Sequence, residues 1–234
     1  MGPSLSHQKA REILDADYRA PAKKGDLLIL SSTLSNTSHE DSSYVTYVGL
    51  IDGLFLQDYP PTPIEVYQLL VDKRFQLVGG ASLGALRAME LEKFGMKGIG
   101  KVFELFKNGT TDADDEVAVT FYPTQYGENT KIEEKEIQSE AMIDIRYNLF
   151  LAHKKHVISD RTKRIAAKVA KSTYFPYRSY SNIIDVTRTK FPDLSGELDS
   201  FSLYLVKNRQ SLKEHDAIKV LKYIKSAYEG KTPA

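Results

Sequence analysis

The sequence predicts an α/β fold: a small, mostly parallel sheet with flanking helices, plus a helical C-terminal half. Two short segments, residues 44–51 and 75–78, have the β-branched and aromatic residues of buried strands. Helical patterns follow them at 64–71 and 83–94, and this strand–helix alternation favours parallel strands. Beyond Phe121 the patterns are mostly helical.

The N-terminal elements are read from turn and capping residues. One of the serines before residue 7 can cap a helix over 7–14. Asp26 can cap a second helix over 27–32. Residues 33–43 are rich in Ser, Thr and Asn and predict a surface loop.

The later elements follow the same logic. Prolines break the chain before the helix at 64–71, and Gly95 ends the helix at 83–94. Residues 96–106 predict another helix, and 117–119 a short strand or extended piece. Further helices are predicted at 137–155, 158–173, 182–190 and within 198–228. We therefore expect two domains, an α/β core over 1–122 and a helical region packed on it over 123–234.

Composition narrows the class of protein. The 234 residues carry a net charge of +1, which argues against a protein whose main task is binding nucleic acid. There is no cysteine, so thiolate nucleophiles and cysteine metal sites are excluded. No apolar stretch is long enough for a membrane span and no leader opens the chain, so we expect a cytoplasmic protein without membrane contact.

The most informative motif is Gly80-x-Ser82-x-Gly84, between the second strand and its helix. This spacing raises a serine onto a sharp strand-to-helix bend, beside the unpaired N–H groups of the helix start. Such donors suit an oxyanion or a carboxylate. A glycine-rich turn that only packs the helix against the sheet is an equally good interpretation of the spacing alone.

Two more features belong to this argument. Asp52 and Gly53 end the first strand, and parallel strands bring their carboxyl ends to one edge, where ligands usually bind. The acidic run over 112–116 is either solvated charge or a recognition loop, and it lacks the pattern of a calcium loop. We expect no metal and no cofactor.

A nucleophilic serine needs a base. An α/β-hydrolase would place an acid and a histidine on later strands, and few strands follow Ser82. A Ser–Lys pair remains chemically open, because a desolvated lysine can lose its proton near neutral pH.

The chain resembles the TfuA family. The resemblance rests on four ordered blocks, residues 48–55, 79–91, 94–100 and 112–119. Shorter matches lie at 10–14, 24–26, 145–147 and 174–180, so that it covers about residues 2–185.

The resemblance implies a function beside a YcaO enzyme in peptide backbone thioamidation. TfuA-like proteins are understood to release sulfide from a thiocarboxylated, ubiquitin-like carrier of the ThiS type, through a hydrolase-like Ser–Lys site. The partners would be YcaO, the carrier and, through YcaO, a precursor peptide. A non-catalytic adaptor that recruits peptide or carrier to YcaO is the alternative.

The resemblance also suggests roles for single residues. Ser82 is expected to be the nucleophile or to contact the oxyanion. Asp52 is expected to orient a base, to donate to the site or to cap the turn at Gly53. The residues expected to bind substrate are Gly53, Gly80, Gly84, Arg87 and Glu65. Arg87 could bind a carboxylate through its fork of donors or form a salt bridge to the acids at 112–116. Glu65 could pair with a lysine or face water.

Two departures from the family pattern bear on these roles. Where the family commonly has a lysine after the aspartate–glycine block, this chain has Ile64. The lysines considered as substitutes are Lys23, Lys24, Lys73, Lys97 and Lys101. The family also usually has a short apolar strand before Gly-Pro-Ser, whereas Met1 directly precedes Gly2 here.

Overall fold

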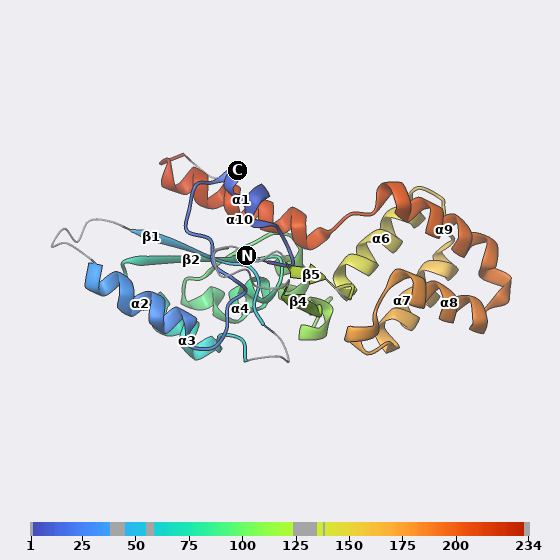
Figure 1. The fold of residues 1–234 in the computed structure, drawn as a ribbon, viewed down its shortest axis with the longest axis horizontal. Coiled ribbons are helices and arrows are strands. Elements are labelled where there is room, and N and C mark those ends of the chain that lie inside the picture. The colour runs from blue at the N-terminus through green and yellow to red at the C-terminus, as the bar shows by residue number, and fades with distance from the viewer. Residues whose placement is uncertain (1, 38–44, 55–58, 124–134, 138, 232–234) are drawn as a thin grey trace. The chain divides into compact units, whose positions relative to one another are not determined.

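The structure, a computed structural model, forms two compact units (Figure 1). It describes residues 2–37, 45–54, 59–123, 135–137 and 139–231. The first unit comprises residues 1–114, 125–134 and 213–234, and the second comprises 115–124 and 135–212. The predicted division used two continuous segments, whereas in this division the chain returns to the first unit for its last helix.

The first unit contains a three-stranded parallel sheet, which confirms the small parallel sheet that the sequence predicts. Its strands are β1 (Thr46–Leu50), β2 (Phe75–Gly80) and β3 (Lys97–Ile99), in the order β1-β2-β3. Leu50 is level with Gly79, and Gly80 is level with Ile99. The carboxyl ends of all three strands therefore meet at one edge of the sheet.

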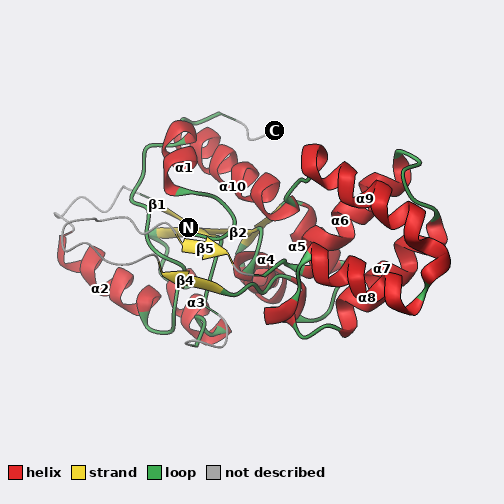
Figure 2. Cartoon of the chain, turned by 45° about the vertical axis from the view of Figure 1, so that its right-hand side comes forward, coloured by secondary structure: helices red, strands yellow, loops and turns green. Residues whose placement is uncertain are grey.

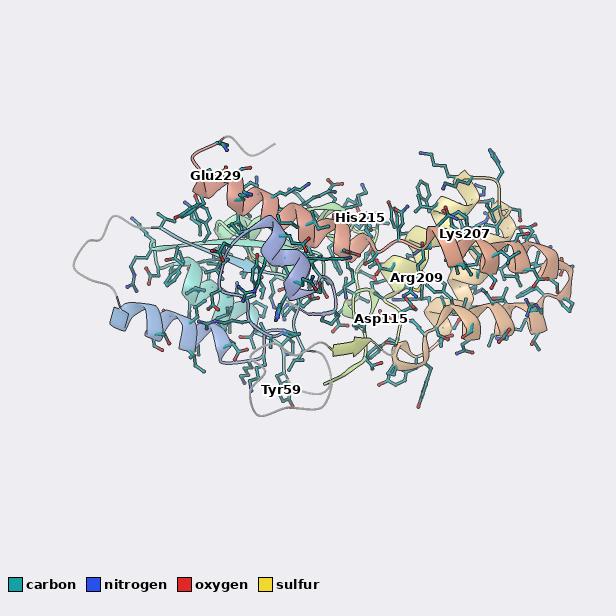
Figure 3. The ribbon with its side chains drawn as sticks, turned by 45° about the horizontal axis from the view of Figure 1, so that its top comes forward. Tyr59, Asp115, Lys207, Arg209, His215 and Glu229 are labelled. Carbon is teal, nitrogen blue, oxygen red and sulfur yellow. The ribbon has the colours of Figure 1, made fainter. Side chains whose placement is uncertain are left out.

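Helices cover both faces of this sheet (Figures 1 and 2). On one face lie α2 (Asp26–Thr37), α3 (Pro63–Leu70) and α4 (Leu83–Leu91). On the other lie α1 (His7–Ile13) and α10 (Leu212–Tyr228). His215 and Glu229, labelled in Figure 3, lie near the two ends of α10. A further helix, α5 (Lys101–Lys107), follows β3.

The core between α10 and the sheet explains why the last helix belongs to the first unit. Ala217, Val220 and Ile224 lie at helical spacing on α10 and are all buried. They belong to the same core cluster as Ile51 and Val78 beside them. This burial is the main stabilising contribution expected of an amphipathic helix.

The second unit is mostly helical and has a core of its own. Its helices are α6 (Met142–Lys154), α7 (Asp160–Ser172), α8 (Tyr180–Lys190) and α9 (Ser195–Asn208). Their buried faces share one apolar cluster that includes Ile145, Ile183 and Phe201. A short antiparallel pair, β4 (Phe121–Pro123) and β5 (Lys135–Ile137), precedes them.

Two predictions about elements were wrong. Residues 97–99 form β3 rather than the start of a helix, because they pair with β2 and Gly100, at φ +99°, separates them from α5. The helix α2 continues to Thr37, into the predicted loop at 33–43; residues 38–43 lie outside the described residues. Of the two alternatives for 117–119, a short strand or an extended piece, the strand is not formed. Three-residue strands are too short to show a hydrophobic period.

Candidate functional site

Ser82 lies at a strained strand-to-helix turn, as its motif predicts. Ala81, the residue before it, has φ +66°, which is uncommon for a residue with a side chain. The Ser82 N–H donates to the carbonyl of Gly80 at 2.8 Å, which closes the turn. Ser82 then takes the N-cap position of α4. The backbone thus has the sharp bend that brings a serine to the end of a sheet.

The three glycines assigned to substrate binding lie where backbones approach closely. A Cβ on Gly84 would come 1.7 Å from the carbonyl oxygen of Leu50, and one on Gly80 would come 2.5 Å from that of Ile99. A Cβ on Gly53 would meet the Leu83 side chain at 2.1 Å. Each position therefore has a packing requirement for glycine, and their contact with a substrate stays a prediction.

The Asp52 carboxylate makes internal hydrogen bonds. It accepts from the Ser4 hydroxyl at 2.6 Å and from the Ser4 N–H at 3.1 Å. Asp52 is 3% exposed and Ser82 is 2% exposed. Because they follow neighbouring parallel strands, they lie at the same edge of the sheet, as expected, and both side chains are buried.

Glu65 holds the start of α2. Thr62 caps α3 by accepting from the main-chain N–H of Glu65 at 3.2 Å. The side chain of Glu65 reaches another helix. One carboxylate oxygen accepts from the N–H groups of Gly25 at 3.0 Å and Leu27 at 3.1 Å. Glu65 is buried, so it does not face water, and its negative charge lies where the dipole of α2 favours it.

Glu65→Ala is expected to destabilise the protein by about 3 kcal/mol, because two charge-assisted hydrogen bonds are lost and their donors stay buried. Denaturant unfolding of the variant and the wild type would measure this. Glu104→Ala is the matched control, since Glu104 is an exposed glutamate paired with Lys101 and should cost less than about 1 kcal/mol. Equal losses for the two variants would contradict the capping role.

Arg87 is also committed to internal contacts. Its Nε donates to the carbonyl of Pro61 at 2.7 Å, and one terminal nitrogen pairs with Glu90 at 2.8 Å. The alternative that it bridges to the acids at 112–116 was wrong, at least for the two whose ion pairs the structure describes. Asp115 and Glu116 pair with cations of the second unit instead.

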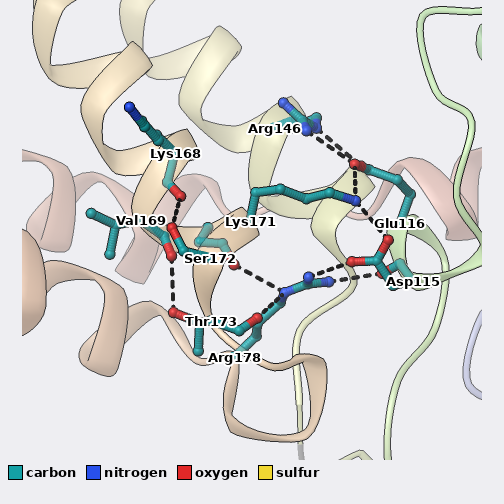
Figure 4. Close-up of polar contacts among 10 residues, drawn as sticks. Asp115, Glu116, Arg146, Lys168, Val169, Lys171, Ser172, Thr173 and Arg178 are labelled. Carbon is teal, nitrogen blue, oxygen red and sulfur yellow. Dashed lines mark hydrogen bonds and ion pairs between the residues drawn. The ribbon is translucent and has the colours of Figure 1, made fainter.

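Those two acids form a five-residue ionic cluster within the second unit (Figure 4). Glu116 accepts two hydrogen bonds from Arg146, at 2.9 and 3.0 Å, and pairs with Lys171. Asp115 pairs with Lys171 and Arg178, both at 2.6 Å. Burial disfavours ionisation, but hydrogen bonds from these cations outweigh it and lower the pKa of both carboxyls. The interpretation of this run as solvated charge therefore fails for Asp115 and Glu116.

The lysines considered as partners for Ser82 are all exposed. Lys101 pairs with Glu104, and Lys24 lies over the ring of Tyr59. A lysine that sequence reasoning missed is Lys213, which is 3% exposed. Lys213 lies four residues before Ala217 on α10, and this helix passes from Asp216, beside Gly100 after β3, to Ile224, beside Gly49 within β1. Fully buried lysines are rare, so the residue type gave no hint of this burial. The available signal was its position, four residues before the apolar residue Ala217 on the same helix.

Metal and membrane sites find no support in the described part of the chain. No group of three or more His, Asp or Glu side chains is placed there to hold a metal ion. Every helix among the described residues is too short or too polar to cross a bilayer.

The fold and the site define an α/β protein with a buried serine at a strand–turn–helix bend and a helical second unit. The chain belongs to the TfuA-like protein family, whose match covers residues 52–179, from Asp52 through Ser82 to the end of the ionic cluster. No curated protein matches the sequence. Membership of this family suggests a YcaO-associated role in thioamidation.

Proposed function

We propose that this chain serves a YcaO enzyme in peptide backbone thioamidation as a binding partner that recruits the peptide or the sulfur carrier. One observation carries the proposal. The polar side chains expected to do chemistry, Ser82, Asp52, Glu65 and Arg87, are all buried. Three of them bond to neighbouring backbone or side chains and so support the fold. With these side chains buried, the chain would act on other molecules by binding them at its surface and in its grooves.

Hydrolysis of a carrier thiocarboxylate is the second candidate, and two observations favour it. Ala81 holds the turn in a conformation that costs on the order of 1 kcal/mol or more, and strain of this kind clusters at functional sites. Lys213 is buried on α10, three residues before Asp216, which lies beside Gly100 after β3, at the same edge of the sheet as Ser82. In this candidate, Ser82 attacks the thiocarboxylate carbon and Lys213 takes the serine proton. Sulfide leaves, and water then releases the carrier from the acyl-serine as a carboxylate.

One assay separates the two candidates. A ThiS-type carrier with a C-terminal thiocarboxylate is incubated with wild type, Ser82→Ala or Lys213→Met, and sulfide is measured. For an adaptor we expect all three to match the rate without protein. In a second assay, with a YcaO enzyme and its peptide substrate, we expect wild type and Ser82→Ala to lower the KM for the peptide by the same factor. Sulfide release that is lost in Ser82→Ala would overturn the adaptor proposal in favour of hydrolysis.

A further inference from the structure

A cavity of about 360 Å³ lies along the outer edge of β1, within the first unit. Its floor is the strand and its continuation, from Thr46 to Asp52. Leu221 and Ile224 of α10 line one side, and Leu27 and Leu30 of α2 line the other. Since these helices cover opposite faces of the sheet, the cavity occupies the layer of the sheet itself.

The edge of β1 that faces this cavity is open to pairing. Among the described residues, β1 pairs along its length only with β2. The Thr46 N–H donates to the main-chain carbonyl of Arg74, on the β2 side, at 2.8 Å. Because N–H groups alternate in direction along a strand, Tyr47 and Gly49 present theirs to the cavity. Unpaired main-chain groups of this kind are a template for another strand.

Just beyond the end of β1, the chain makes one isolated bridge with itself. Ala22 forms a parallel bridge with Gly53, through its N–H to Asp52 and its carbonyl to the N–H of Leu54. The chain's own residues between Leu14 and Ala22 line the cavity at that end, which leaves the part along β1 for another segment.

The lining defines the chemistry of the occupant. Leucines and isoleucine flank both faces of the strand position, so a strand there is apolar on both faces. The charged groups around it already have partners: Asp52 bonds to Ser4, Asp26 to the Lys23 N–H, and Asp17 to Arg19. Three carboxylates and one guanidinium line the cavity, and bonds from neutral donors do not cancel a charge, so an acidic side chain would enter without a counterion. A second copy of this chain would have to bring its own β1, which has helices on both faces, into a cavity that α2 and α10 line on two sides, so a free extended segment is the better occupant.

We propose that this groove binds an extended segment of another polypeptide, a short uninterrupted run of small apolar residues, as a fourth strand beside β1. Main-chain hydrogen bonds hold the segment, and the apolar walls select its side chains. This site lies at the outer edge of the sheet, and its peptide binding does not depend on chemistry at Ser82.

The test uses the whole chain and a fluorescein-labelled peptide, acetyl-KVVAVVK-amide, whose lysines only keep it soluble. Fluorescence anisotropy is expected to show saturable binding. The same peptide with N-methyl groups at alternate residues keeps every side chain but loses strand pairing, and we expect about tenfold weaker binding from the lost hydrogen bonds.

A pair of variants locates the site. Leu30→Trp places a large ring in the groove and is expected to weaken binding about tenfold or more, whereas Ile29→Trp, at a neighbouring position that is 60% exposed and does not line the groove, leaves binding unchanged. If Leu30→Trp does not fold by circular dichroism, the methylated peptide with wild type decides the question.

The proposal is overturned if wild type does not bind at millimolar peptide, if methylation leaves affinity unchanged, or if folded Leu30→Trp binds as well as Ile29→Trp. Neither YcaO nor carrier is present in the titration. A negative result there leaves the role beside YcaO untouched, and a failure of that role leaves the groove untouched.

Discussion

Gly84→Ala is expected to prevent folding or to cost more than the about 1–3 kcal/mol that is typical of overpacked cores. The added Cβ would lie 1.7 Å from the Leu50 carbonyl oxygen and 2.5 Å from its carbonyl carbon, and both are backbone atoms that cannot rotate away. The Gly84 N–H also donates to the Ile51 carbonyl at 3.0 Å. The start of α4 would therefore have to leave the end of β1.

Circular dichroism and denaturant unfolding measure this effect. The matched control is Gly196→Ala in α9, where no atom lies within 4 Å of the new Cβ. Because alanine favours a helix over glycine by about 1 kcal/mol, this variant should be as stable as wild type or slightly more so. A Gly84→Ala protein within about 1 kcal/mol of wild type would show that the close approach is relaxed in solution.

The same result bears on how activity data are interpreted. Gly84 belongs to the motif that predicts a serine site, and loss of function in a Gly84 variant could be taken as loss of substrate binding. The contact with Leu50 gives a folding reason for the glycine, so only variants with wild-type unfolding profiles inform on binding.

Arg178→Met is expected to destabilise the protein by about 4 kcal/mol, the range found when one partner of a buried ion pair is removed. Arg178 is 2% exposed and pairs with the Asp115 carboxylate. It also donates to the carbonyls of Asp115, Ala170 and Thr173, at 2.7–3.0 Å. The variant leaves these carbonyls buried and removes one of the two cations of Asp115. Arg188→Met is the control, because its pairs with Asp185 and Asp199 are exposed and contribute little.

The pH dependence of this effect has a defined sign. The pKa of Asp115 is lower in the folded protein than in the unfolded chain, where a carboxyl of this type titrates near ~4. The stability it contributes is therefore fully present above that unfolded value and is lost as the pH falls through the lowered folded value. The gap between wild type and Arg178→Met should narrow in acid below about pH 4. A gap that stays constant down to acid denaturation would mean that lost packing, not the ion pair, causes it.

The sequence predicted two of the three strands of the parallel sheet, because their signals are local. The β-branched run at 44–51 and the apolar run at 75–78 became β1 and β2. A serine before residue 7 caps α1 as expected, namely Ser6. The turn at Ser82 has the expected sharp bend, although its left-handed residue is Ala81. Such signals depend on residues within one turn or one strand, which is why they can be read without the fold.

Contacts distant in sequence were not predictable in this way. Nothing near Glu65 indicates that its carboxylate reaches the N–H groups of Gly25 and Leu27, 40 and 38 residues earlier. The acids Asp115 and Glu116 read as solvated charge because their partner Lys171 lies more than 50 residues later. The burial of Lys213 likewise depends on where α10 returns to the sheet.

The sequence by itself determined the parallel α/β core, the helical second half, the serine turn and the resemblance to the TfuA family. Each follows from local patterning or from residues that are contiguous in the chain. Only the tertiary structure decided that Ser82 and Asp52 are buried, that Glu65 caps a distant helix, and that the outer edge of β1 faces an apolar groove. Burial and edge pairing depend on which segments meet in space, and that information is spread over the whole chain rather than held in any one motif.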